Sequence, residues 1–171
     1  KYYSLTKTLI LSGIQCEKKL WFDLNDKIKV KDKAIFRSGN KFNDVVRKHY
    51  GEGLDLSDER EHQIVIERTK EAIQSDNINV IYEAGFLFKK TFIRADVLIK
   101  KDNQWTMLEA KASTSVKDIN ISDLAIQSFI VKNSGLDVIC NKFIHINKEF
   151  IYKGDKNYKD LIVEVDITKE V

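Results

Sequence analysis

Proline is absent from the 171-residue sequence, and cysteine occurs only twice, as Cys16 and Cys140. Without proline-rich or low-complexity stretches, nothing in the sequence marks a linker between two domains. Two cysteines are too few for a disulfide framework or a four-thiolate metal site within this chain. No hydrophobic run approaches the roughly 18 to 20 residues that a membrane-spanning helix needs. We therefore expect a single domain over residues 1–171, away from the membrane and in the cytoplasm. Because the chain begins with Lys1 rather than Met, we expect a fragment of a longer protein.

Positive charge is concentrated near the amino terminus. Residues 1–50 carry 12 Lys or Arg and 5 Asp or Glu, a net charge of +7, whereas the remainder carries 17 and 21, a net charge of −4. A basic segment of this kind favours a polyanionic partner such as DNA or RNA. Our candidate nucleic-acid contacts are Lys33, Arg37 and Lys41, which follow Lys27, Lys29 and Lys31. A solvated, lysine-rich surface is the alternative.

The periodicity of the sequence changes near residue 78 from helical to strand-like. Expected helices cover residues 4–10, 16–24, 36–50 and 57–76, and a later one covers 119–133. Expected strands cover residues 80–88, 91–100, 105–112, 138–146, 150–152 and 161–165. Short turns between the first three strands indicate an antiparallel meander. This order predicts an α/β (α+β) fold, mainly helical over 1–77, with a mixed β-sheet flanked by helices over 78–171.

Side chains alternate between the two faces of a strand, so polar residues can be assigned to faces. Within 91–100 the odd-numbered positions from Ile93 to Ile99 are all apolar. We expect this face to cover the core and Asp96 to lie on the other face. In the next strand Glu109 and Lys111 share one face. The sequence therefore predicts that Asp96 and Glu109 lie on neighbouring strands, with Lys111 beside them.

Two converging carboxylates repel each other unless a cation lies between them. Hard oxygen ligands select Mg²⁺ or Mn²⁺, so Asp96 and Glu109 predict a divalent-metal site that Glu83 of the first strand could join. Lys111 would add a positive charge that orients an attacking water or neutralises a phosphate. The alternative is an ordinary cross-strand charge pair on an exposed sheet face.

Gln127 occurs in the helix expected over 119–133, on the same apolar stripe as Leu124 and Val131. A buried glutamine needs hydrogen-bond partners. If it faces the sheet, Gln127 could position a carboxylate or a nucleic-acid group. A partly exposed glutamine is equally compatible with the pattern.

Three motifs resemble those of the PD-(D/E)XK nuclease superfamily: Arg94-Ala95-Asp96, Leu108-Glu109-Ala110-Lys111 and Gln127. Within the superfamily the chain most resembles the RecB-like branch. It is especially similar to a bacterial domain family of unknown function related to the CRISPR-adaptation exonucleases that hold an iron–sulfur cluster. The likeness spans most of the chain, including residues 11–21, 109–118 and 145–150. It implies a restriction-endonuclease-like core.

The resemblance also implies a ligand set. Asp96 and Glu109 would bind Mg²⁺ or Mn²⁺, with the Ala110 carbonyl as a third ligand and Glu83 as an additional acid near the metal.

The same resemblance implies a function. Lys111 would be the catalytic lysine, and Gln127 would support the substrate or the geometry of the site. The chain would then be a hydrolase, a Mg²⁺- or Mn²⁺-dependent deoxyribonuclease that cuts phosphodiester bonds in DNA. The alternative is an inactive nuclease-like module that binds nucleic acid, or a structural domain of a larger assembly.

Two positions depart from the family pattern. RecB-like enzymes often have a metal-binding histidine four residues after a glycine, but here Gly39 is followed at that distance by Asn43. His49, nearly two turns further along, is interpreted as a surface or packing residue. Cys16 matches the first cluster cysteine of the related exonucleases, but the other three have no counterpart before Val171. An iron–sulfur cluster is therefore not expected in this chain.

Overall fold

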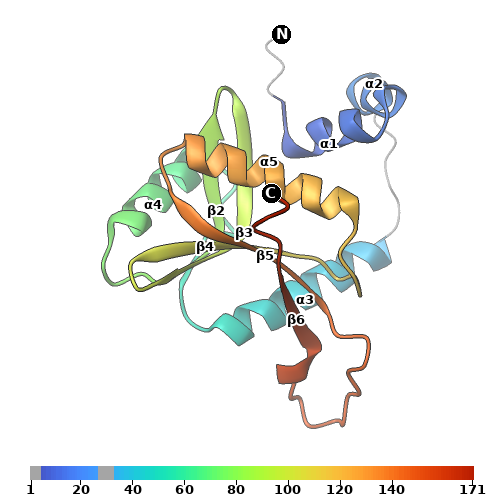
Figure 1. The fold of residues 1–171 in the computed structure, drawn as a ribbon, viewed down its shortest axis with the longest axis vertical. Helices are drawn as coiled ribbons and strands as arrows, with labels where there is room; N and C mark the ends of the chain where they lie inside the picture. Colours follow the sequence, from blue (N-terminus) through green and yellow to red (C-terminus); the bar gives the residue numbers. More distant parts are fainter. Residues whose placement is uncertain (1–4, 27–32) are drawn as a thin grey trace.

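A computed structural model describes residues 5–26 and 33–171, without the side chains of residues 33–38 (Figure 1). The α-helices in the described parts are α1 (Lys7–Gln15), α2 (Glu17–Asn25), α3 (Lys33–Tyr50), α4 (His62–Gln74) and α5 (Asp118–Asn133). The strands are β1 (Leu54–Asp55), β2 (Val80–Phe88), β3 (Thr91–Lys101), β4 (Gln104–Ala110), β5 (Val138–Ile146) and β6 (Ile162–Asp166). A 3-10 turn, η1 (Lys159–Leu161), precedes β6.

The strands form one six-stranded sheet in the order β1-β2-β3-β4-β5-β6. Strands β2, β3 and β4 are the predicted antiparallel meander. Strand β1 pairs parallel with β2, β5 pairs parallel with β4, and β6 pairs antiparallel with β5. Helix α5 supplies the crossover that a parallel β4–β5 pair requires. The predicted α/β fold with a mixed sheet is confirmed.

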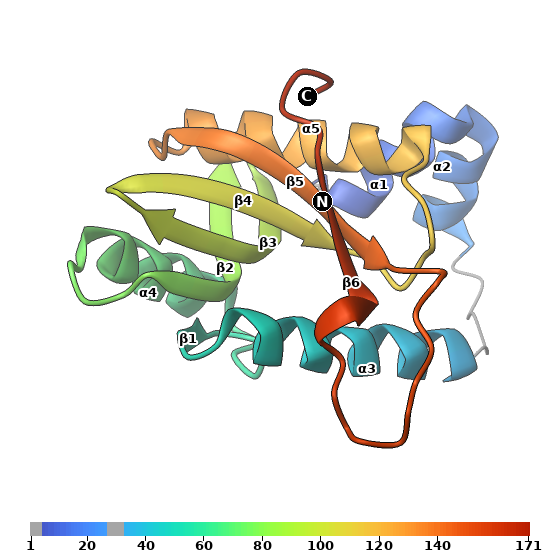
Figure 2. The ribbon, with the colours of Figure 1, turned by 60° about the horizontal axis from the view of Figure 1, so that its bottom comes forward.

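Helices cover both faces of the sheet, with α5 on one side and α3 on the other (Figure 2). The larger core packs side chains of α4 and α5 against the sheet, including Val65, Leu124 and Met107. The smaller core packs Phe42 and Val46 of α3 against the sheet. Apolar burial on both faces is the dominant stabilising contribution.

Strand β3 crosses from one core to the other, so the face assignment made from its alternation is wrong. Ala95 belongs to the core under α4 and α5, whereas Val97, also odd-numbered, belongs to the core under α3. Opposite this point in β2, Glu83 has a φ of 56°, a left-handed conformation that non-glycine residues rarely adopt. This local distortion breaks the alternation of side chains, and Asp96 lies at the crossover.

Several predicted boundaries differ from the structure. The helix expected over 57–76 begins at His62, and the short strand β1 was not predicted. Residues 150–152, expected to be a strand, have no regular secondary structure. None of the helices in the described ranges has the length and apolar character of a membrane span.

Candidate active site

Six polar side chains from four parts of the fold come together near the end of β4. They are Lys7 of α1, Asp96 of β3, Glu109 of β4, Lys111 just after β4, and Asp123 and Gln127 of α5.

Glu109 is the centre of this cluster, and its side chain is 0% exposed. One carboxylate oxygen, Oε1, accepts hydrogen bonds from Lys7 Nζ at 3.3 Å and from Lys111 Nζ. The other, Oε2, accepts a hydrogen bond of 2.7 Å from Gln127 Nε2. Burial alone would raise the pKa of Glu109, but the ammonium groups of Lys7 and Lys111 outweigh it and lower the pKa. Glu109 is therefore a buried, charged carboxylate.

Asp123 adds a second carboxylate to the network. Its Oδ1 lies 2.9 Å from Lys7 Nζ, and its Oδ2 lies 3.7 Å from Lys111 Nζ. Burial acts to lower the pKa of both lysines, but Glu109 and Asp123 raise it above the ordinary value. Two ammonium groups thus balance two carboxylates. Such pairing is what makes charge at a buried position tolerable.

Asp96 lies beside this network and makes a different contact. Its Oδ2 accepts a hydrogen bond of 2.8 Å from the backbone N–H of Ala110. The pairing of β3 with β4 extends only as far as Val97 and Leu108. Beyond that point the strands separate, and the Asp96 carboxylate accepts the hydrogen bond that a backbone carbonyl of a paired strand would accept. Burial, followed by the charge of Glu109, raises the pKa of Asp96. Among the described residues Asp96 is in no ion pair, so an added cation would favour its charged form.

A small cavity between α3 and the sheet brings further predicted residues together. Asn43, Glu83, Asp96 and Ala110 are among its lining residues. Asn43 is the position where the resembled family carries a histidine, and it lies beside the acids of β2 and β3. Burial raises the pKa of Glu83, although Arg94 and Arg47 partly oppose this effect.

Within residues 5–26 and 33–171, no group of three or more His, Cys, Asp or Glu side chains is arranged to hold a metal. The available donors are nevertheless the hard oxygens that Mg²⁺ and Mn²⁺ prefer. In addition, Gln127 Oε1 is buried without a hydrogen-bond partner in the described structure. A buried polar atom of this kind calls for a water, an ion or a ligand. The donor chemistry therefore fits a hard divalent ion, although Glu109 is engaged by lysines.

The structure brings Glu109, Lys111 and Gln127 into direct contact and places Asp96 next to them. The sequence led us to expect Lys111 beside Glu109 and left open whether Gln127 faces the sheet. Glu83 shares a cavity with Asp96, and in the described structure no hydrogen bond or ion pair joins it to Glu109. Lys41 is exposed on α3. Of the other basic candidates, Lys27, Lys29 and Lys31, and the side chains of Lys33 and Arg37, lie outside the described residues.

Sequence reasoning missed two members of the cluster, Lys7 and Asp123. Asp123 precedes Gln127 by four residues, and its Oδ1 accepts a hydrogen bond of 3.0 Å from Gln127 Nε2. Its i, i+4 spacing from a glutamine on the buried helix face was a usable signal. Nothing in the sequence around Lys7 indicates that it reaches a site more than 100 residues away.

No protein-family model and no curated protein matches the chain. The crystal structure of SSO0001 is similar, with 15% sequence identity over 96% of this chain and 79% of that chain and a TM-score of 0.31. A similarity of this size carries no argument about function.

Proposed function

We propose that this chain is a metal-dependent nuclease domain of the RecB-like PD-(D/E)XK type that hydrolyses phosphodiester bonds in DNA. The observation that carries the proposal is the buried Glu109 carboxylate, held by Lys111 and Gln127 with Asp96 alongside. Carboxylates, an ammonium group and an amide from separate elements form the set that phosphodiester hydrolysis uses. The basic amino-terminal segment supports a nucleic-acid partner. A cytoplasmic location belongs to the same proposal.

A Mg²⁺ or Mn²⁺ ion would be held by the oxygens of Asp96 and Glu83, together with the Ala110 carbonyl. Neither acid is in an ion pair in the described structure, and both have a raised pKa. Glu109 would join them once released from one of its lysines. A bound ion of this kind supplies a Lewis acid and lowers the pKa of its water.

The remaining roles belong to the side chains themselves. Lys111 is 39% exposed and donates to Glu109, and its ammonium group would neutralise the charge of an incoming phosphate. Gln127 fixes the orientation of Glu109 through Oε2 and is a positioning residue. Lys7 forms ion pairs with Glu109 and Asp123 and lowers the pKa of Glu109.

The proposal is tested with the purified chain, Mg²⁺ or Mn²⁺, and single-stranded or duplex DNA. Asp96→Asn, Glu109→Gln and Lys111→Met are each expected to reduce cleavage by about 10²-fold or more. Lys132→Ala, which replaces an exposed lysine of α5, is the control. This variant should cleave DNA like the wild type. Circular dichroism and melting curves show whether each variant folds. Absence of cutting by the wild type, with metal affinity unchanged in Asp96→Asn and Glu109→Gln, contradicts the proposal.

One observation favours the alternative, a nuclease-like module that binds nucleic acid without cutting it. Lys7 and Lys111 already balance the charge of Glu109 and Asp123. A structure adapted only to stability or binding would need no further cation. Binding of DNA by folded wild-type chain without cleavage in Mn²⁺ would favour this module over the nuclease.

A further inference from the structure

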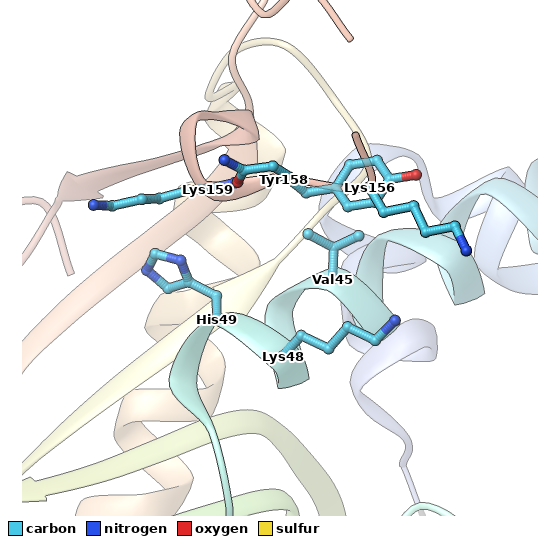
Figure 3. A pocket seen from close by; sticks show the side chains of 7 residues that line it. Val45, Lys48, His49, Lys156, Tyr158 and Lys159 are labelled. Carbon is cyan, nitrogen blue, oxygen red and sulfur yellow. The ribbon is translucent and has the colours of Figure 1, made fainter. Parts of the chain in front are cut away.

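A hollow of about 400 Å³ lies between α3 and the segment over residues 156–159. Its lining includes Val45, Lys48 and His49 of α3, and Lys156, Tyr158 and Lys159 of the segment (Figure 3). We call it the cationic hollow, because three lysines and a histidine line it and no acidic side chain does. Its volume is in the range of small-molecule sites.

In the described structure none of the three lysines of the cationic hollow takes part in an ion pair. Glu164 is an acid that interacts electrostatically with His49. However, its two oxygens already accept hydrogen bonds from Tyr50 and Lys142, at 2.6 and 2.8 Å. Gathered like charges repel, and an anion in the hollow would relieve that repulsion.

The segment that carries two of the lysines is held in place by its own hydrogen bonds. Tyr152 Oη accepts one from the backbone N–H of Lys156 at 3.2 Å, and Asn157 Oδ1 accepts one from that of Lys159 at 3.0 Å. The rings of Tyr152 and Tyr158 stack with centroids 5.3 Å apart. A segment ordered before binding loses less entropy when it binds.

The arrangement of the side chains distinguishes between possible anions. Val45 and His49 point from α3 toward the segment, and the ammonium group of Lys159 lies at the end of the hollow opposite those of Lys48 and Lys156 (Figure 3). A strand offers successive phosphates to the two ends of the hollow, whereas an isolated phosphate offers a single anion. Val45 and Tyr158 add an apolar and aromatic wall suited to sugar and base.

We infer that the cationic hollow binds a single-stranded nucleic acid through successive backbone phosphates. Such contacts recognise the strand without regard to base sequence. Asn43, which lines the cavity beside Asp96, lies on a different face of α3 from Val45 and Lys48. The hollow is therefore distinct from the candidate active site and requires neither a metal nor catalysis.

The test measures binding of fluorescent single-stranded oligonucleotides to the whole chain by anisotropy, in EDTA and at several salt concentrations. Two oligonucleotides of unrelated sequence are compared. The double variant Lys156→Ala/Lys159→Ala removes two phosphate contacts, and Lys132→Ala on α5 removes an exposed lysine on the other face of the sheet. We expect the double variant to bind both oligonucleotides more weakly and to reduce the slope of log affinity against log salt by about 1.4. Lys132→Ala should match the wild type.

Three outcomes overturn the inference. The first is that the wild type does not bind the oligonucleotides, and the second is that the double variant and the wild type have equal affinity and salt slope. The third is that the chain binds inorganic phosphate or a mononucleotide but not the strand. Because EDTA removes divalent ions, binding without any cleavage leaves the inference standing even if the proposed nuclease function fails.

Discussion

The ammonium nitrogen of Lys7 lies 2.9 Å from Oδ1 of Asp123, and this contact ties α1 to α5. The same nitrogen lies 3.3 Å from Oε1 of Glu109. An amino-terminal helix thus contributes a charge to a site whose acids come from the second half of the chain.

Lys7→Ala is expected to destabilise the fold, because it leaves Glu109 and Asp123 with Lys111 as their remaining cation. The loss in free energy of unfolding should be about 2–3 kcal/mol, less than for a fully buried pair since Lys7 retains some solvent contact. Mn²⁺ should raise the melting temperature of Lys7→Ala more than that of the wild type, since a divalent cation can replace the missing charge.

The control for Lys7 is Lys148→Ala, because Lys148 and its partner Glu149 are both largely exposed. An exposed pair contributes little to stability, so this variant should melt like the wild type. Equal stability of Lys7→Ala and Lys148→Ala would show that Lys7 does not stabilise the carboxylates.

Gln127→Ala removes the donor to Glu109 Oε2, a charged oxygen of a fully buried side chain. We expect the free energy of unfolding to fall by about 1–3 kcal/mol, the cost of leaving a buried polar group without its partner. Gln63→Ala removes an exposed glutamine of α4. This substitution should change the free energy of unfolding by no more than about 0.5 kcal/mol. Urea denaturation compares the two, and equal effects would contradict the role of Gln127.

Gly85→Ala should destabilise the contact between β2 and α4. A Cβ at this position would lie 2.5 Å from Val65 Cγ1 and 3.1 Å from the ring of Phe92. Overpacking of this kind costs about 1–3 kcal/mol. Val65→Ala makes room, so Gly85→Ala should cost less in a Val65→Ala background. A double-mutant cycle by chemical denaturation measures this coupling, and strictly additive effects would refute the predicted clash.

Glu164 should contribute to acid sensitivity. Partial burial acts to raise its pKa, but hydrogen bonds from Lys142 and Tyr50 outweigh this and keep the pKa below its usual value of 4.5. Because the folded pKa is the lower one, the stabilisation is complete above about pH 4.5 and is lost as the pH falls through the folded value. The difference in stability between the wild type and Glu164→Gln should therefore shrink from about pH 6 to about pH 3. A constant difference in denaturation experiments across this range would contradict it.

The regular parts of the fold were predictable because their signals are local. Alternation in β4 correctly placed Glu109 on the same face as Met107, and in the structure this face meets α5. The helical stripe of α5 put Gln127 among apolar residues without deciding its burial, and the structure buries it. The antiparallel meander followed from short turns. In each case a few neighbouring residues in the sequence determine the local structure.

The features that the sequence did not predict depend on tertiary structure. Strand β3 changes cores at Asp96 because β2 is distorted at Glu83, and no local pattern announces a positive φ at a glutamate. Lys7 enters the site only because α1 packs near α5. Long-range contacts of single charged side chains leave no periodicity in a sequence.

The position of Asp96 at the crossover of β3 has a consequence for protein engineering. Ala95 and Val97, its two neighbours in the chain, are anchored in different hydrophobic cores. Repacking either the core under α5 or the core under α3 should therefore shift the carboxyl group of Asp96. Libraries that leave every polar residue of the site intact are still expected to tune its chemistry.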